Sequence, residues 1–291
     1  MAEKDDTNDG KDYGLQVPFA QSGGFYLKGI EHCGWGMKTR MSRIFNPGSG
    51  RTVMLAFDHG YIMGSTRGLE RLDLAVPPLV PHVDALMATR GALRSCIHPT
   101  HGKAVVLRSS AGGSVLDDDM SFENRGVDVE DAVRMSADCM AIQVFIGGGG
   151  QVQSIKNLTK TIDAGNRFGI PTLGVVAVGK SMERTTRYFL LATRMIAELG
   201  AHIVKTYYCE GFEKVTAACP VPIVVAGGKK VDEKDALEMA WKAVDGGALG
   251  VDMGRNIFQA ENPSAMTQAI GKVVHHNFSV REAYEFYRDL K

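Results

Sequence analysis

One lysine lies in an apolar stretch, where an amine would be unusual. Lys205 stands in IVKTYY, a run with the length and composition of a buried strand. Side chains alternate along a strand, so Lys205 and Ile203 share one face while Val204 faces the other way. Burial among apolar side chains favours the neutral amine, which can attack a carbonyl carbon. The alternative is a lysine that extends to solvent or pairs with a carboxylate.

Two glycine-containing pairs follow later apolar runs and predict a phosphate site. Gly227 and Gly228 stand in VVAGGKK, and Gly254 and Arg255 stand in VDMGRN. Glycine lets backbone N–H groups approach phosphate oxygens, and a guanidinium adds charge-assisted hydrogen bonds. Either pair alone is more often an ordinary turn, but the two together favour a phosphate cradle. Lys229 would assist it, with a solvated lysine at the rim as the alternative.

A carboxylate and an imidazole end the first apolar run. MLAFDHG places Asp58 and His59 where they could transfer a proton or orient the amine of Lys205. An aspartate that only caps the following loop is the alternative. Tyr207 shares the parity of Lys205, so it would line the same pocket if the strand continues that far.

Metal and thiol chemistry are weaker interpretations of this sequence. His275 and His276 are adjacent on an expected helix and point in different directions, and His98 and His101 make no convincing ligand set. Cys209 lacks a nearby histidine signature, and buried cysteines are usually inert. We therefore expect neither a catalytic metal nor a thiol nucleophile.

Eight apolar runs of strand length position these residues. Each is followed by a helical stretch, which is the pattern of repeated βα units around a parallel sheet. Eight strands favour a closed (β/α)8 barrel, or TIM barrel, over an open doubly wound sheet of about five or six strands. The runs are TVMLAFD from Thr52, DALMAT from Asp84, AVVLRS from Ala104, MAIQVF from Met140, TLGVVAV from Thr172, HIVKTY from His202, PIVVAGG from Pro222 and LGVDMG from Leu249.

Amphipathic segments lie between the runs, with apolar residues three or four positions apart. They are VEDAVRMSA, QSIKNLTKTIDAGNRFG, RYFLLATRMIAELG and EKDALEMAWKAVDGG, and the last two close with the glycines that end helices. Active sites of such barrels form where strands end, and the loops after the seventh and eighth strands often hold phosphate. Lys205, Asp58 and both glycine pairs lie at these positions.

Length and composition indicate one barrel domain with an N-terminal extension. The 291 residues suit a barrel of about 250 residues plus an extension, which we place at residues 1–51, with the barrel at 52–291. Residues 1 to about 24 are polar and glycine-rich, and we expect a mobile or loosely docked arm there. The segment that follows, with Trp35, would form a short helix at the bottom of the barrel.

Charge and hydropathy narrow the partners and the compartment. The 33 basic and 33 acidic residues cancel, which argues against nucleic acid or an anionic membrane and favours a small metabolite. No apolar stretch approaches the roughly 18 residues of a membrane span, and the start MAEKDDTNDGKD lacks the apolar core of a secretory signal. We expect a cytoplasmic protein.

The motifs together resemble the class I aldolase family that includes the archaeal-type fructose-bisphosphate aldolases. The similar stretches are MLAFDHG, IVKTYY, AGGKK and GVDMGRNIFQ, and they occur in the same order. The resemblance implies that Lys205 forms a Schiff base and that Asp58 is the acid of the first strand. It also implies a phosphate site formed by Gly227, Gly228, Gly254 and Arg255.

The fifth run departs from the aldolase pattern. Those aldolases carry a fifth strand with Trp and Tyr, whose tyrosine assists proton transfer, whereas TLGVVAVGK has no aromatic residue. The stretches WGMKTRMSRIFNP, SIKNL, RYFLLATR and VVAGGKK instead resemble a thiolase branch of the family. That resemblance implies a small phosphorylated ketone as substrate, coenzyme A as co-substrate, no bound cofactor, and a place in degradation of the phosphorylated autoinducer-2 signal.

Two other functions would use the same residues. A class I Schiff-base aldolase would cleave a phosphorylated sugar in this pocket, and a non-catalytic barrel would bind a phosphorylated metabolite without forming a covalent bond. Coenzyme A leaves no motif in the sequence, so its binding surface rests on resemblance alone. The resemblance further implies a homo-oligomer, for which a ring such as a decamer is one arrangement.

Overall fold

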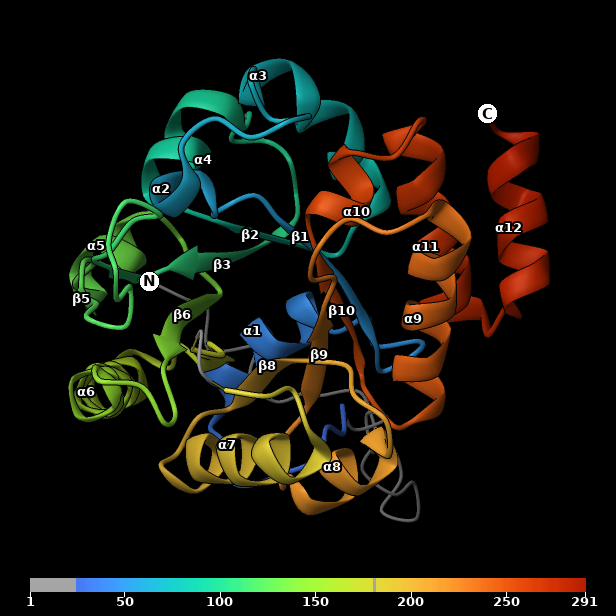
Figure 1. Ribbon diagram of the computed structural model, residues 1–291. Helices are drawn as coiled ribbons and strands as arrows, with labels where there is room; N and C mark the ends of the chain where they lie inside the picture. The colour runs from blue at the N-terminus through green and yellow to red at the C-terminus, as the bar shows by residue number, and fades with distance from the viewer. Residues whose placement is uncertain (1–24, 180–181) are drawn as a thin grey trace, which may run out of the picture.

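Eight parallel strands close into a barrel in the computed structural model, which describes residues 25–179 and 182–291 (Figure 1). The order around the barrel is β1-β10-β9-β8-β7-β6-β3-β2, so the predicted (β/α)8 fold is confirmed. The expected N-terminal arm lies outside the described residues. The barrel strands coincide with the eight predicted runs: β1 (Thr52–Ala56), β2 (Ala85–Ala88), β3 (Ala104–Arg108), β6 (Cys139–Val144), β7 (Thr172–Val176), β8 (Ile203–Tyr207), β9 (Ile223–Ala226) and β10 (Gly250–Met253).

Helices surround the barrel, and the four predicted amphipathic segments form α5, α6, α7 and α9. A two-stranded hairpin, β4 (Ser110–Ala111) with β5 (Asn124–Arg125), interrupts the alternation after β3. No helix in the described part of the chain is long and apolar enough to cross a membrane. The helices are α1 (Trp35–Ile44), α2 (Gly60–Met63), α3 (Leu72–Ala75), η2 (Pro77–His82), α4 (Arg90–Cys96), α5 (Val129–Arg134), α6 (Gln151–Phe168), α7 (Thr186–Glu198), α8 (Phe212–Ala218), α9 (Glu233–Asp245), α10 (Arg255–Phe258), α11 (Pro263–His276) and α12 (Val280–Asp289).

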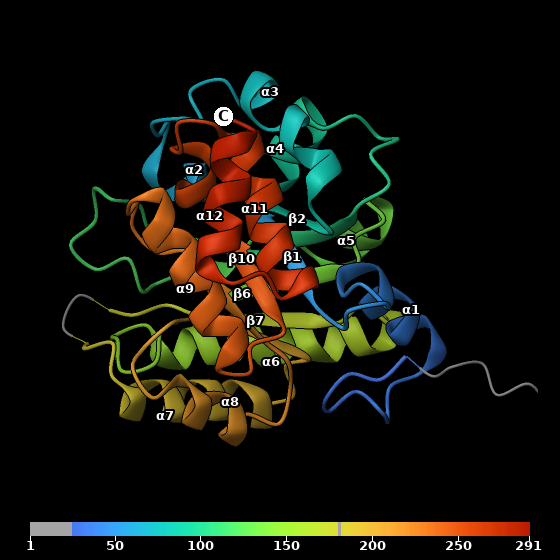
Figure 2. The same ribbon diagram turned by 90° about the vertical axis from the view of Figure 1, so that its right-hand side faces the viewer.

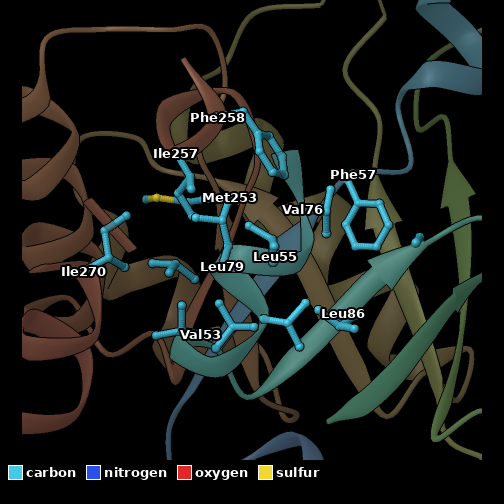
Figure 3. Packing of buried hydrophobic residues seen from close by; sticks show 14 of the residues in the cluster. Val53, Leu55, Phe57, Val76, Leu79, Leu86, Met253, Ile257, Phe258 and Ile270 are labelled. Carbon is cyan, nitrogen blue, oxygen red and sulfur yellow. The ribbon is translucent and has the colours of Figure 1, made fainter. Parts of the chain in front are cut away.

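Alternate strand residues build an outer core between strands and helices. Val53, Leu55 and Met253 face outward and pack with Leu79 and Ile270, as Figure 3 shows. Burying each such side chain contributes roughly 2 kcal/mol. These contacts hold the strands in place, and the residues between them on each strand point into the barrel.

The inward residues form a second core that the N-terminal extension closes. Met41, Ile44 and Phe45, at the end of α1, pack in one cluster with Met54 and Ile203 from the strands. Figure 2 shows α1 beyond one end of the barrel. We call this end, where strands begin, the lower end, and the end where they finish the upper end. The predicted helix at the bottom of the barrel is therefore confirmed.

A glycine lets β10 lie against β1 and close the barrel. Gly250 has a φ of 135°, and a Cβ there would lie 1.9 Å from the backbone oxygen of Thr52. A residue with a side chain would push the two strands apart. With glycine in place, the register sets Asp252 opposite Met54, and both side chains point into the barrel.

Candidate active site

A cavity of about 220 Å³ opens at the upper end of the barrel. Eight of the nine predicted site residues line it: Asp58, His59, Lys205, Tyr207, Gly227, Gly228, Gly254 and Arg255. The ninth, Lys229, is exposed and does not line the cavity, so the prediction that it belongs to the pocket is wrong. Gly228 has a φ of 68° and the chain bends at Lys229, which leaves this residue exposed.

Lys205 is buried at the base of the cavity, with 8% of its surface exposed. As predicted, Ile203 packs inside the barrel with it, and Val204 packs against the outer helices. The amine Nζ lies 2.8 Å from Oδ2 of Asp252 and 3.5 Å from the Met87 sulfur. The amine therefore lies among apolar atoms and beside one carboxylate. It is buried, as the first interpretation of the sequence predicted, and paired with a carboxylate, as the alternative predicted.

Asp252 is the residue beside Lys205 that the sequence analysis missed. Its side chain is fully buried, and Oδ1 has no hydrogen-bond partner among the described residues. Burial raises the pKa of the Asp252 carboxyl; the ammonium of Lys205 opposes that shift and the nearby carboxylate of Asp58 adds to it. Its inward parity on β10, two residues after Gly250, was the available signal in the sequence.

Asp58 faces a second buried cation at the end of β3. Nε of Arg108 lies 3.5 Å from Oδ2 of Asp58, and both side chains are more than nine-tenths buried. The guanidinium also donates to the Tyr61 hydroxyl, at 2.6 Å from Nη2, and to the side-chain oxygen of Gln143. Arg108 is the last residue of β3 and has the same inward parity as Ala104 and Val106, so alternation could have identified it.

Tyr61 connects this network to the hairpin after β3. Its hydroxyl donates to Oε1 of Glu123 at 2.7 Å, and Glu123 is buried. Burial raises the pKa of the Tyr61 phenol, so the hydroxyl stays protonated and serves as a donor. No sequence signal could have found Glu123, because it reaches the barrel from a loop.

His59 is the N-cap residue of the short helix α2 and lines the cavity. Its Nε2 lies 3.1 Å from the Thr66 hydroxyl. Burial lowers the pKa of the imidazole, although Asp58 opposes the shift. The ring is therefore neutral at neutral pH and can either donate or accept one proton.

The two glycine pairs meet at one side of the cavity. A Cβ at Gly254 would lie 2.4 Å from the backbone oxygen of Ala56, so only glycine fits there. Asn256 joins the two loops, because its Nδ2 donates to the Gly227 oxygen at 2.7 Å and its Oδ1 accepts from the Val231 N–H at 2.9 Å. Both pairs thus line the same cavity, as the predicted phosphate site requires, and Asn256 was missed by the sequence analysis.

A second arginine lies over the glycine side of the cavity. The guanidinium carbon of Arg184 lies 3.9 Å from the ring centroid of Tyr207, in a cation–π contact. A Cβ at Gly228 would lie 3.8 Å from the Arg184 side chain. Across the cavity β7 contributes Val175, and this strand carries no aromatic residue, in line with the departure noted in the fifth run.

The geometry of the described residues does not support metal or thiol chemistry. Within residues 25–179 and 182–291, no three His, Cys, Asp or Glu side chains are placed to hold a metal ion. His275 lies at the lower end, where its Nε2 is 2.9 Å from Asp84. Burial raises the pKa of the Cys209 thiol, which disfavours the thiolate that a nucleophile requires.

A (β/α)8 barrel with a buried amine at its upper end defines a class of enzymes able to act on carbonyl compounds. Residues 52–260 match the DeoC/LacD family of aldolases, and the chain belongs to this family. The family resemblance inferred from the sequence is thus confirmed.

Full-length relatives include proteins that carry the name of the thiolase branch expected from the sequence. The chain is 56% identical over 292 residues to the 3-hydroxy-5-phosphonooxypentane-2,4-dione thiolase of Enterobacter sp. (strain 638), covering 100% of this chain and 98% of the relative. It is 54% identical to the protein of the same name from Escherichia coli (strain K12 / DH10B), over the full length of both. It is also 55% identical to an uncharacterised aldolase of Pasteurella multocida (strain Pm70), again over both full lengths.

The fold is shared with more distant solved structures. An archaeal fructose 1,6-bisphosphate aldolase superposes with a TM-score of 0.74 at 24% identity, covering 82% of this chain and 99% of the other. At this identity the likeness concerns the barrel alone.

Proposed function

We propose that this chain is a thiolase that transfers the acetyl group of 3-hydroxy-5-phosphonooxypentane-2,4-dione to coenzyme A. The products are acetyl-CoA and dihydroxyacetone phosphate, and the reaction belongs to degradation of the phosphorylated autoinducer-2 signal. The observation that carries the proposal is the buried amine of Lys205 at the base of a cavity with a glycine-rich side. The names of the full-length relatives supply the substrate.

The phosphate of the substrate binds on the glycine side. The backbone of the two converging loops and the guanidinium of Arg255 hold its oxygens, and Arg184 adds a second positive charge above Gly228. Anchoring the phosphate there sets the neighbouring ketone over Lys205 at the base of the cavity.

The amine of Lys205 forms an iminium with the ketone next to the phosphate-bearing carbon. The thiolate of coenzyme A then attacks the acetyl carbonyl, and the C–C bond between the acetyl carbon and the hydroxyl-bearing carbon breaks. Its electron pair moves into the iminium and gives an enamine. Protonation of the enamine carbon and hydrolysis release dihydroxyacetone phosphate and restore the lysine.

The remaining groups at the upper end serve the acetyl side of the substrate. Nη1 of Arg108 is buried without a partner among the described residues, and Arg108 lines the cavity. This nitrogen donates to the acetyl oxygen as negative charge develops on it. Asp58 and His59 line the same cavity and transfer protons to and from the substrate.

Val175 favours acyl transfer over sugar cleavage. An aldolase needs a group that takes the proton of the aldol hydroxyl, and β7 offers only aliphatic side chains at this position. Cleavage by a thiol has no such requirement, because the acetyl carbon leaves as a thioester.

The test is acetyl-CoA formation from the phosphorylated dione by the purified chain. Formation requires coenzyme A and vanishes in Lys205→Ala; activity that survives this substitution contradicts the mechanism. Cleavage of a phosphorylated sugar without coenzyme A would favour the aldolase. Borohydride treatment with dihydroxyacetone phosphate separates both from a binding protein, which would give no covalent adduct.

We also propose the wider setting of the enzyme. Residues 52–291 carry the chemistry, residues 1–51 are an extension, and the enzyme acts in the cytoplasm as a homo-oligomer, with a decameric ring as one arrangement. Tyr26 and Trp35 of the extension are 79% and 83% exposed, which suits contacts between subunits. Light scattering of the full chain measures the number of subunits.

A further inference from the structure

The base of the cavity holds a carboxylate that the proposed mechanism leaves without a role. Asp252 is fully buried, and its Oδ2 lies 2.8 Å from the Lys205 amine. We propose that Asp252 is the catalytic acid and base of Schiff-base formation, which takes the proton from Lys205 and returns it to the leaving water. The inference rests on the Schiff-base role proposed for Lys205.

The position of Asp252 follows from the barrel geometry. Its neighbours on β10, Val251 and Met253, pack in the outer core, so the carboxylate points inward. The residues in register with it on the adjacent strands are Met54 and Ala226, which offer no hydrogen bond from their side chains. β9 separates β8 from β10, so the contact between Lys205 and Asp252 crosses the barrel interior.

The two carboxylates of the cavity differ in their cations. Asp58 faces Arg108, whose guanidinium keeps its charge throughout catalysis. Asp252 faces Lys205, and among the described residues no other cation lies within ion-pair distance of it. The partner of Asp252 is thus the group that must lose a proton before it can attack a ketone, and a carboxylate at 2.8 Å is the group placed to receive that proton.

Burial makes the protonated form of Asp252 accessible. Burial of the carboxyl raises its pKa, against the effect of Lys205 and with the help of the Asp58 charge. Oδ1 remains without a partner among the described residues, so it can donate once the carboxyl is protonated.

The proton transfers balance over the whole step. The ammonium of Lys205 gives one proton to Asp252, and its lone pair forms the N–C bond while the carbonyl electron pair moves to oxygen. Asp252 protonates that oxygen and takes a second proton from the new N–C nitrogen, which gives the neutral carbinolamine. It then returns its proton to the carbinolamine hydroxyl, which leaves as water as the iminium forms. Lysine ammonium and ketone become iminium and water, and Asp252 ends as a carboxylate.

The experiment measures how fast the full chain forms an adduct with dihydroxyacetone phosphate, using timed borohydride quenching and intact mass. Asp252→Asn keeps the shape of the side chain but cannot accept the proton. We expect the adduct to form more slowly by on the order of 100-fold, without an equal loss of phosphate affinity. Asp252→Ala should form the adduct slowly as well. Formate, a small carboxylate that fits the vacated space, should raise the rate of adduct formation by this variant at least ten-fold.

Asp138→Asn is the matched control, because Asp138 is also buried and ion-paired, to Arg43 at 2.8 Å, but lies at the lower end. It should lose thermal stability and keep the wild-type adduct rate. Folded Asp252→Asn with an unchanged rate, or folded Asp252→Ala that formate does not rescue, overturns the role of Asp252. If wild type itself forms no adduct at Lys205, the proposed function fails and the inference falls with it.

Discussion

The two ends of the barrel use carboxylates in opposite ways. At the lower end Asp84 accepts the Val53 N–H at 2.7 Å and pairs with His275, and Asp138 accepts the Val105 N–H at 3.0 Å and pairs with Arg43. These carboxylates fasten one strand to the next.

At the upper end the ionic groups retain unused hydrogen-bonding capacity. Oδ1 of Asp252 and Nη1 of Arg108 are buried without partners within the described residues, and both residues line the cavity. An unpaired buried polar atom costs about 1–3 kcal/mol, so such groups are retained where a ligand completes them. The lower end therefore stabilises the barrel, and the upper end holds polar groups that are free to form hydrogen bonds with a substrate.

Removing the positive charge of Arg108 at the upper end should have the largest effect on activity. In Arg108→Met the acetyl oxygen loses its donor and Asp58 loses its partner, so kcat/KM should fall by on the order of 1000-fold. Steady-state acetyl-CoA formation measures it. Arg43→Met, which removes a lower-end cation, should change kcat/KM by less than about two-fold. Equal losses of kcat/KM in Arg108→Met and Arg43→Met would contradict the different roles assigned to the two ends.

The lower end should show its role in the pH dependence of stability. Burial lowers the pKa of His202 from 6.5 to about 4, and its Nδ1 accepts the Thr172 N–H. The folded state therefore favours the neutral ring, so this stability is complete above pH 6.5 and is lost as the pH falls toward 4. Over that window wild type should lose about 3 kcal/mol more than His202→Gln in urea unfolding. Parallel curves for the two proteins would contradict this assignment.

A glycine substitution at the upper end should give a smaller effect on stability. The Cβ of Gly254→Ala would meet the Ala56 oxygen, and separating the strands should cost about 2 kcal/mol and raise the KM for the phosphorylated substrate. Gly271→Ala on α11 is the control, since its Cβ meets nothing within 4 Å and alanine should stabilise the helix by about 0.5–1 kcal/mol. An unchanged KM in Gly254→Ala would remove this glycine from the phosphate site.

The sequence predicted the parts of the site that depend on one strand or one turn. Strand parity placed Lys205 inside the barrel, and glycine chemistry brought Gly227 and Gly254 to one side of the cavity. Asp252 was missed although it lies in a quoted motif, because its meaning depends on a strand two places around the barrel from Lys205. Glu123 was beyond reach, since a loop outside the βα repeat delivers it.

The most direct test of the upper end is to find where a ketone becomes attached. Wild-type chain treated with dihydroxyacetone phosphate and borohydride should gain one reduced adduct, and peptide mass spectrometry should place it on Lys205. Lys205→Ala should gain none and should produce no acetyl-CoA from the dione. An adduct on another lysine, or acetyl-CoA formation that persists in Lys205→Ala, would contradict the assignment of the upper end as a Schiff-base site.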